Sequence, residues 1–105
     1  MKGTQDYMAP EILLGKVQKY DSYVDIFSLG LIFYQCTHNL KHPYGPEMDE
    51  CYINYKRHYE KDDLNIEFDN SINNEDFKDL IRKMLKLNPI NRISWEEYFE
   101  HPFFK

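Results

Sequence analysis

The most apolar part of the chain lies between residues 24 and 34, "VDIFSLGLIFY". Wound as a helix, its hydrophobic residues cover every face rather than one stripe, and a helix of that kind is buried on all sides. Asp21 and Ser22 are good N-caps, so we expect the helix to begin at one of them. A central helix needs a shell of other elements, and 105 residues supply only a thin one. We therefore expect part of the fold to lie outside this chain.

An amphipathic stripe predicts another helix near residue 80. Its apolar residues recur at i, i+3, i+4, i+7 and i+8, the spacing of one helix face. They are Phe77, Leu80, Ile81, Met84 and Leu85. Asn74 precedes the stripe as an N-cap, and the two acidic residues that follow it are favoured there by the helix dipole. Asn88-Pro89 ends the helix, because the residue before a proline avoids the helical conformation.

The last helix has a clear start and end. Ser94 and Glu97 have the spacing of a capping box, in which each side chain bonds to the other residue's backbone N–H. His101-Pro102 ends the helix, and two phenylalanines follow it.

Weaker signals predict two more helices. Pro10 suits the first turn of a short helix, and Gly15 can end it in a left-handed cap. A polar helix spans about residues 48–61, whereas residues 62–74 are extended or irregular. With about five helices and no substantial sheet, the predicted fold class is mainly α.

Composition narrows the function classes. The chain has room for one domain, and its 16% of aromatic residues argues against disorder. A net charge of −5 with scattered basic residues indicates neither a nucleic-acid partner nor an anionic membrane surface. No apolar stretch is long enough for a membrane segment. Two cysteines are too few for a disulfide scaffold, so we expect a reducing, cytoplasmic location.

No metal site is expected. Cys36, His38, His42 and Cys51 do not have the spacing of zinc ligands. We expect Cys36 to be a small buried residue and both histidines to lie in a loop. The adjacent carboxylates at 96–97 could serve acid–base chemistry, but the capping box explains the second of them without it.

Four motifs in order carry a resemblance to the eukaryotic protein kinases. Residues 3–11, "GTQDYMAPE", resemble the end of the activation segment, which Ala-Pro-Glu closes. Residues 25–30, "DIFSLG", are similar to the D-x-W-S-x-G motif of the central buried helix, with Phe in place of the usual Trp. "NPINRIS" at 88–94 and "HPFF" at 101–104 are similar to the turn before the last helix and to the family's C-terminal stop. The resemblance implies a partial kinase domain over 1–105, a helical fragment of the C-terminal lobe.

The resemblance assigns roles to three residues near the N-terminus. Thr4 matches a threonine that hydrogen-bonds the catalytic aspartate and its partner lysine, a pattern that goes with serine/threonine specificity. Tyr7 and Met8 match the loop that receives the substrate residue after the phosphoacceptor. The residues themselves also allow plainer readings, a turn threonine bonded to its own backbone and simple packing.

Two structural roles are implied as well. Glu11 and Arg92 match an ion pair that ties the end of the activation segment to the turn before the last helix. Asp25 and Gly30 belong to the motif that braces the catalytic loop from the central helix. The plainer alternatives are two solvated surface charges and an aspartate that faces water.

The implied function belongs to a longer protein. The resemblance implies ATP-dependent phosphoryl transfer to protein Ser and Thr hydroxyls, with ATP and magnesium bound by upstream motifs. The chain has no Gly-rich loop, V-A-I-K lysine, H-R-D or D-F-G motif, so we expect no catalytic residue in it and no activity from it alone. Its expected partners are the upstream half of the kinase domain and a protein substrate. The alternative is a non-catalytic kinase-like binding module or a remnant.

Overall fold

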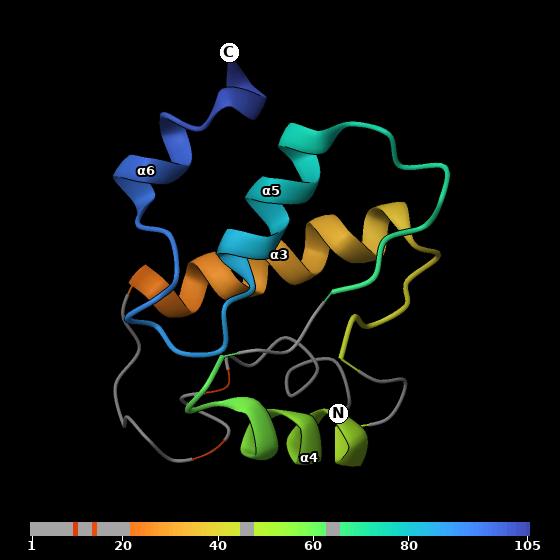
Figure 1. Cartoon of the computed structure of the whole chain (residues 1–105), viewed down its shortest axis with the longest axis vertical. Coiled ribbons are helices and arrows are strands. Elements are labelled where there is room, and N and C mark those ends of the chain that lie inside the picture. Colours follow the sequence, from red (N-terminus) through yellow and green to blue (C-terminus); the bar gives the residue numbers. More distant parts are fainter. Residues whose placement is uncertain (1–9, 11–13, 15–21, 45–47, 63–65) are drawn as a thin grey trace.

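A computed structural model describes residues 10, 14, 22–44, 48–62 and 66–105 of the chain (Figure 1). Four α-helices follow one another in these parts, and the 3-10 helix η1 (Pro102–Phe104) closes the chain. The α-helices are α3 (Ser22–Thr37), α4 (Met48–His58), α5 (Glu75–Met84) and α6 (Trp95–Phe99). No strand occurs in the described ranges, so the predicted mainly α fold is confirmed.

Helix α3 is the centre of the packing. Helices α5 and α6 both contact it, and η1 packs against α5 (Figure 1). The core is formed by one side of α3 together with α5 and the segments that flank them; its fully buried members include Ile26, Phe27, Leu31, Leu80, Ile81 and Met84. The expectation that α3 is buried on all sides is wrong for this chain, because Ile32 remains 43% exposed. That residue lies on a face of α3 that the described residues do not cover.

A glycine sets the close approach of α3 and α5. A Cβ atom added to Gly30 would lie 2.9 Å from Cδ2 of Leu85 and 3.0 Å from Cβ of Met84. Real Cβ atoms hardly ever come that close, so a larger residue at position 30 would push the two helices apart. Gly30 is therefore the contact point at which α5 and the residue after it pack onto the central helix.

The helix ends follow the predicted local chemistry. Oδ1 of Asn74 accepts a hydrogen bond from the Phe77 N–H at 3.0 Å, which confirms the N-cap of α5. Oγ of Ser94 accepts from the Glu97 N–H at 3.1 Å, and a Glu97 carboxylate oxygen accepts from the Ser94 N–H at 3.2 Å. The capping box of α6 is therefore present, and it accounts for Glu97. The short turn η1, which was not predicted, then follows His101.

The short helix predicted from Pro10 is described only at its two ends. The N–H of Leu14 donates to the Pro10 carbonyl at 2.8 Å, which is the spacing of a helical turn. Among the described helices, none has the length and apolar character needed to cross a membrane.

The prediction for Cys36 is wrong, whereas His38 lies in the turn after α3, as predicted for a loop residue. Cys36 is exposed, and Cys51 is the buried cysteine. His38 is buried with its ring stacked on Tyr34, the ring centroids 3.8 Å apart. Its Nε2 accepts from the Asp69 N–H at 2.9 Å, so Nδ1 carries the proton and donates to the Tyr34 carbonyl at 2.9 Å. The burial of this loop histidine was not predicted, because helical periodicity says nothing about residues beyond the last turn of α3.

Candidate functional site

The candidate site is the turn between α5 and α6, and Arg92 is its centre. Arg92 is only 3% exposed although it is charged. Its Nε donates to the Lys86 carbonyl at 2.9 Å, and Nη2 donates to the Leu87 carbonyl at 3.0 Å. The guanidinium carbon lies 4.9 Å from the ring centroid of Phe27, in a cation–π contact with α3. The Arg92 side chain thus joins two parts of the turn to each other and joins the turn to the central helix.

The carboxylate of Asp62 accepts hydrogen bonds from the same turn. Its Oδ1 accepts from the Leu87 N–H at 2.7 Å, and its Oδ2 accepts from the Asn88 N–H at 3.2 Å and from Nδ2 of Asn91 at 3.0 Å. Asp62 has a φ of 52°, a left-handed conformation that aspartate tolerates better than most residues. Sequence reasoning missed this carboxylate, because no motif surrounds it.

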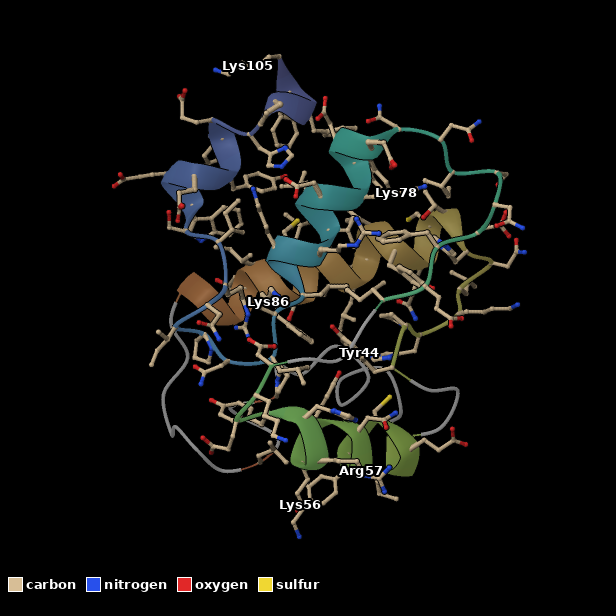
Figure 2. The ribbon with its side chains drawn as sticks, viewed as in Figure 1. Tyr44, Lys56, Arg57, Lys78, Lys86 and Lys105 are labelled. Atoms are coloured by element: carbon tan, nitrogen blue, oxygen red, sulfur yellow. The ribbon has the colours of Figure 1, made fainter. Side chains whose placement is uncertain are left out.

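Tyr44 also contacts this part of the chain and lies between α3 and α4 in Figure 2. Its hydroxyl donates to the Leu85 carbonyl at 2.6 Å, and its own carbonyl accepts from Nδ2 of Asn54 at 2.7 Å. Burial, followed by the nearby charge of Asp62, raises the pKa of the Tyr44 hydroxyl far above its usual range. The neutral phenol is thus a fixed donor that links the loop after α3 to the end of α5.

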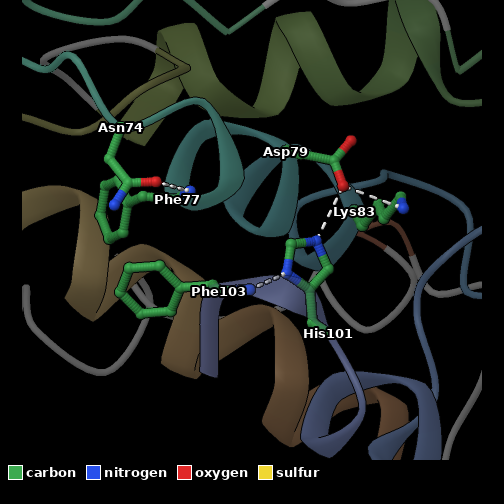
Figure 3. A network of polar contacts seen from close by, with 6 residues as sticks. All are labelled: Asn74, Phe77, Asp79, Lys83, His101 and Phe103. Carbon is green, nitrogen blue, oxygen red and sulfur yellow. Dashed lines mark hydrogen bonds and ion pairs between the residues drawn. The ribbon is translucent and has the colours of Figure 1, made fainter. Parts of the chain in front are cut away.

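A second polar cluster fixes the C-terminus to α5 (Figure 3). Oδ2 of Asp79 lies 2.7 Å from Nε2 of His101 and 2.9 Å from Nζ of Lys83. The Phe103 N–H donates to Nδ1 of His101 at 3.0 Å, so Nε2 carries the proton and donates to Asp79. The hydrogen bond from Lys83, with that from His101, lowers the pKa of the Asp79 carboxyl against the effect of its burial. The "HPFF" motif therefore not only ends α6 but also joins the C-terminus to α5.

Four of the predicted site residues lie outside the described part of the chain. They are Thr4, Tyr7, Met8 and Glu11. The substrate-binding residues and the ion pair to Arg92 therefore stay predictions, although the buried position of Arg92 is what such a pair requires.

The two predicted residues of the central helix have different surroundings. Gly30 is buried at the contact of α3 with α5, whereas Asp25 is exposed in the first turn of α3. The structure brings Arg92 next to the motif of residues 25–30, but through Phe27 rather than through Asp25. The bracing role of the aspartate remains a prediction.

The polar side chains of the described residues near this turn bond to other parts of the chain. Among the described residues, no three His, Cys, Asp or Glu residues gather to hold a metal ion. A cavity of about 490 Å³ lies beside the turn, but its two carboxylates, Glu97 and Glu100, are bonded to Ser94 and Lys105. The geometry is therefore that of an anchoring site, which fixes backbone segments to one another.

Comparisons with known proteins identify the family of this chain. A sequence model of the protein kinase domain matches residues 1–104. The chain is 37% identical over 101 residues to the serine/threonine-protein kinase ATG1b of Arabidopsis thaliana, covering 96% of this chain and 14% of the relative. It is 36% identical to the serine/threonine-protein kinase apg-1 of Neurospora crassa, covering 95% of this chain and 10% of the relative.

A solved structure has the same fold. The twitchin kinase region of C. elegans superposes with a TM-score of 0.74 at 30% identity, and the match covers 100% of this chain and 18% of that one. The chain thus spans only about a seventh or less of the two curated relatives. The match to the family model confirms the resemblance carried by the four motifs, and the chain belongs to the protein kinase family.

Proposed function

We propose that this chain forms the substrate-side helical part of a serine/threonine protein kinase. In the complete protein, a phosphoryl group passes from ATP to a Ser or Thr hydroxyl of a protein substrate. The upstream part of the domain binds ATP and magnesium and supplies the catalytic base. We place the complete kinase in the cytoplasm, and its partners are the upstream half of the domain and the protein substrate.

One observation carries the proposal: Arg92 is buried with its backbone contacts already formed. A guanidinium at 3% exposure is costly unless it is paired, and it is well suited to bind a carboxylate through two parallel N–H bonds. Glu11, at the end of the segment that carries Thr4, Tyr7 and Met8, is the proposed carboxylate. The pair would hold the proposed substrate-binding segment against the central helix.

A chimeric kinase tests the proposal. The whole chain replaces the matching 101-residue segment of the Arabidopsis ATG1b kinase, to which it is 37% identical. We expect the chimera to transfer labelled phosphate from ATP to Ser or Thr of a basic protein substrate. Thr4→Ala should lower the transfer strongly, because Thr4 is proposed to position the catalytic groups.

Thr37→Ala is the matched control. Thr37 is exposed at the end of α3, and its hydroxyl bonds only to nearby backbone and to the adjacent His38. Its loss should leave the transfer unchanged. A chimera that unfolds cooperatively but transfers no phosphate would contradict the proposal and favour the kinase-like binding module.

A further inference from the structure

Three exposed phenylalanines near the C-terminal end of the molecule are linked through the ring of Tyr98. They are Phe99 of α6 and Phe103 and Phe104 of η1, with exposed fractions of 64%, 37% and 45%. We call them the aromatic surface. Exposed aromatic rings that lie together, unlike single exposed apolar residues, mark an interaction site.

The rings of the aromatic surface are held by contacts with one another and with the core. The buried ring of Tyr98 lies 5.0 Å from that of Phe99 and 4.9 Å from that of Phe104, centroid to centroid. Phe103 lies 5.2 Å from Phe104 and 5.5 Å from Phe77 of α5. The rings are thus positioned before any partner arrives, which reduces the entropy lost on binding.

The backbone below these rings is fixed as well (Figure 3). His101 is buried, and its two ring nitrogens contact Asp79 of α5 and the backbone N–H of Phe103. The 3-10 turn that carries two of the phenylalanines is therefore tied to a core helix. A partner would meet a shaped surface rather than a loose chain end.

The segment that carries the aromatic surface is acidic. Residues 94–105 contain three carboxylates, at Glu96, Glu97 and Glu100, and one ammonium, at Lys105, so their charge is 1 minus 3, or −2. Nζ of Lys105 lies 3.2 Å from a Glu100 carboxylate oxygen, whereas Glu96 is an exposed carboxylate one helical turn before Phe99. An anionic membrane or a second copy of this acidic chain would be repelled.

We propose that the aromatic surface docks a cationic amphipathic segment of another protein. Apolar side chains of that segment lie against the three phenylalanine rings, and its Arg or Lys side chains meet Glu96 and stack over ring faces. This binding function is separate from the proposed phosphoryl transfer. It uses three phenylalanines to which the proposed transfer assigns no role, so either proposal can fail alone.

Titration of the chain with a synthetic peptide tests the docking proposal. The probe is an amphipathic helix of Leu, Lys and Arg; one control peptide has Glu in place of Lys and Arg, and another has Gly and Ser in place of Leu. We expect only the amphipathic cationic peptide to bind well. The double variant Phe99→Ser, Phe104→Ser should weaken its binding by about tenfold or more, because central aromatic rings dominate such interfaces.

Matched variants separate the surface from general stickiness. Leu40→Ser and Ile53→Ser remove apolar side chains that are 77% and 51% exposed, after α3 and on α4, and they should leave the affinity unchanged. Glu96→Gln keeps every ring in place and should weaken binding most at low salt, where charges are least screened. Thermal unfolding of each variant shows whether its fold is intact.

Other occupants give recognisable results that overturn the proposal. Equal loss of binding in the Leu40→Ser or Ile53→Ser variant would mean that the peptide does not use this surface. Equal binding of the glutamate peptide would show that the partner needs no positive charge. Equal binding of the leucine-free peptide would show that it needs no apolar side chains. Binding to phosphatidylserine vesicles instead of peptide would assign the surface to a membrane, and a dimer abolished by Phe99→Ser would assign it to a second copy.

Discussion

Asp62 accepts a hydrogen bond from the backbone N–H of Leu87 at 2.7 Å, although 25 positions separate the two residues. The same carboxylate bonds to the next backbone N–H, that of Asn88. The end of α4 is thereby joined to the turn that presents Arg92. Asp62, which has a left-handed backbone conformation, thus helps to hold Arg92, the most buried cation of the described residues, in place.

Replacing Asp62 should loosen this turn. We expect Asp62→Ala to lower the free energy of unfolding by about 2 kcal/mol, because it leaves partly buried N–H groups unpaired and strains the backbone. Asp62→Gly removes only the hydrogen bonds and should cost less than the alanine. Urea unfolding measures both, with Glu67→Gln as a control for loss of an exposed carboxylate. Equal stability of the Ala variant and the wild type would contradict the role given to Asp62.

The parts of the fold that sequence could predict are those with local causes. The N-cap at Asn74 and the capping box of Ser94 and Glu97 join residues three positions apart, so the sequence displays both partners together. The start of α3 at Ser22 coincides with one of the two predicted positions. Local hydrogen bonds and helical periodicity are sufficient for these elements.

The contacts of the candidate site join distant residues and could not be predicted in this way. The hydroxyl of Tyr44 reaches the Leu85 carbonyl across 41 positions, and His101 meets Asp79 across 22. Only the packing of helices brings such partners together, and no spacing rule expresses it. Arg92 was identified through its motif, whereas its contact with Phe27 required the structure.

Gly30→Ala should destabilise the contact of α3 with α5. The added methyl group would lie 2.9 Å from Cδ2 of Leu85 and 3.0 Å from Cβ of Met84, and overpacking of this kind costs about 1–3 kcal/mol. Alanine's better helix propensity offsets at most about 1 kcal/mol of that loss. Thermal unfolding should therefore show a lower midpoint, while Cys36→Ala on the exposed end of the same helix should not. A raised midpoint for Gly30→Ala would mean that the helices adjust freely.

Stability should fall on the alkaline side because of Tyr44. Its pKa is raised in the folded protein by burial, so its contribution is fully present below pH 10, the ordinary tyrosine value, and is lost as the pH rises above it. Burial also raises the pKa of Tyr34 and Tyr98, so they act in the same direction. Tyr44→Phe should reduce the alkaline loss and cost about 1 kcal/mol at pH 7, where its hydrogen bond to Leu85 is missing.

Urea unfolding between pH 7 and 11 checks the tyrosine prediction. Tyr52→Phe is the control, because Tyr52 is 41% exposed on α4 and its loss removes a tyrosine that is not buried. If Tyr44→Phe and the wild type lose the same stability at alkaline pH, ionisation of the Tyr44 phenol is not the cause of the loss.

The chain by itself should transfer no phosphate. The motifs that bind ATP phosphates, magnesium and the substrate hydroxyl are absent from its sequence, and phosphoryl transfer depends on positioning and charge stabilisation by those groups. Incubation of pure chain with labelled ATP, magnesium and a basic protein substrate measures this. Label above that of a Thr4→Ala preparation would be inconsistent with the prediction.

Arg92 should pair with Glu11, 81 positions earlier in the chain. The guanidinium is 3% exposed, so loss of the carboxylate leaves a buried charge without its proposed counter-ion and costs on the order of 3–5 kcal/mol. An exposed pair would contribute at most about 1 kcal/mol, so the two cases are easily separated. The measurement is a double-mutant cycle of Glu11→Gln and Arg92→Met in the chimeric kinase. Because Arg92 also bonds to two carbonyls, its single variant should cost more than that of Glu11.

The cycle isolates the pair from those backbone bonds. A coupling energy well above 1 kcal/mol supports the contact, whereas strictly additive losses refute it. Arg92→Lys provides a second test, because an ammonium cannot make the two parallel hydrogen bonds of a guanidinium, nor can it reach the Lys86 and Leu87 carbonyls together with a carboxylate. We therefore expect lysine to restore only a small part of the stability that Arg92→Met loses. Full restoration would show that position 92 needs only a positive charge, and the proposed directional pair with Glu11 would be wrong.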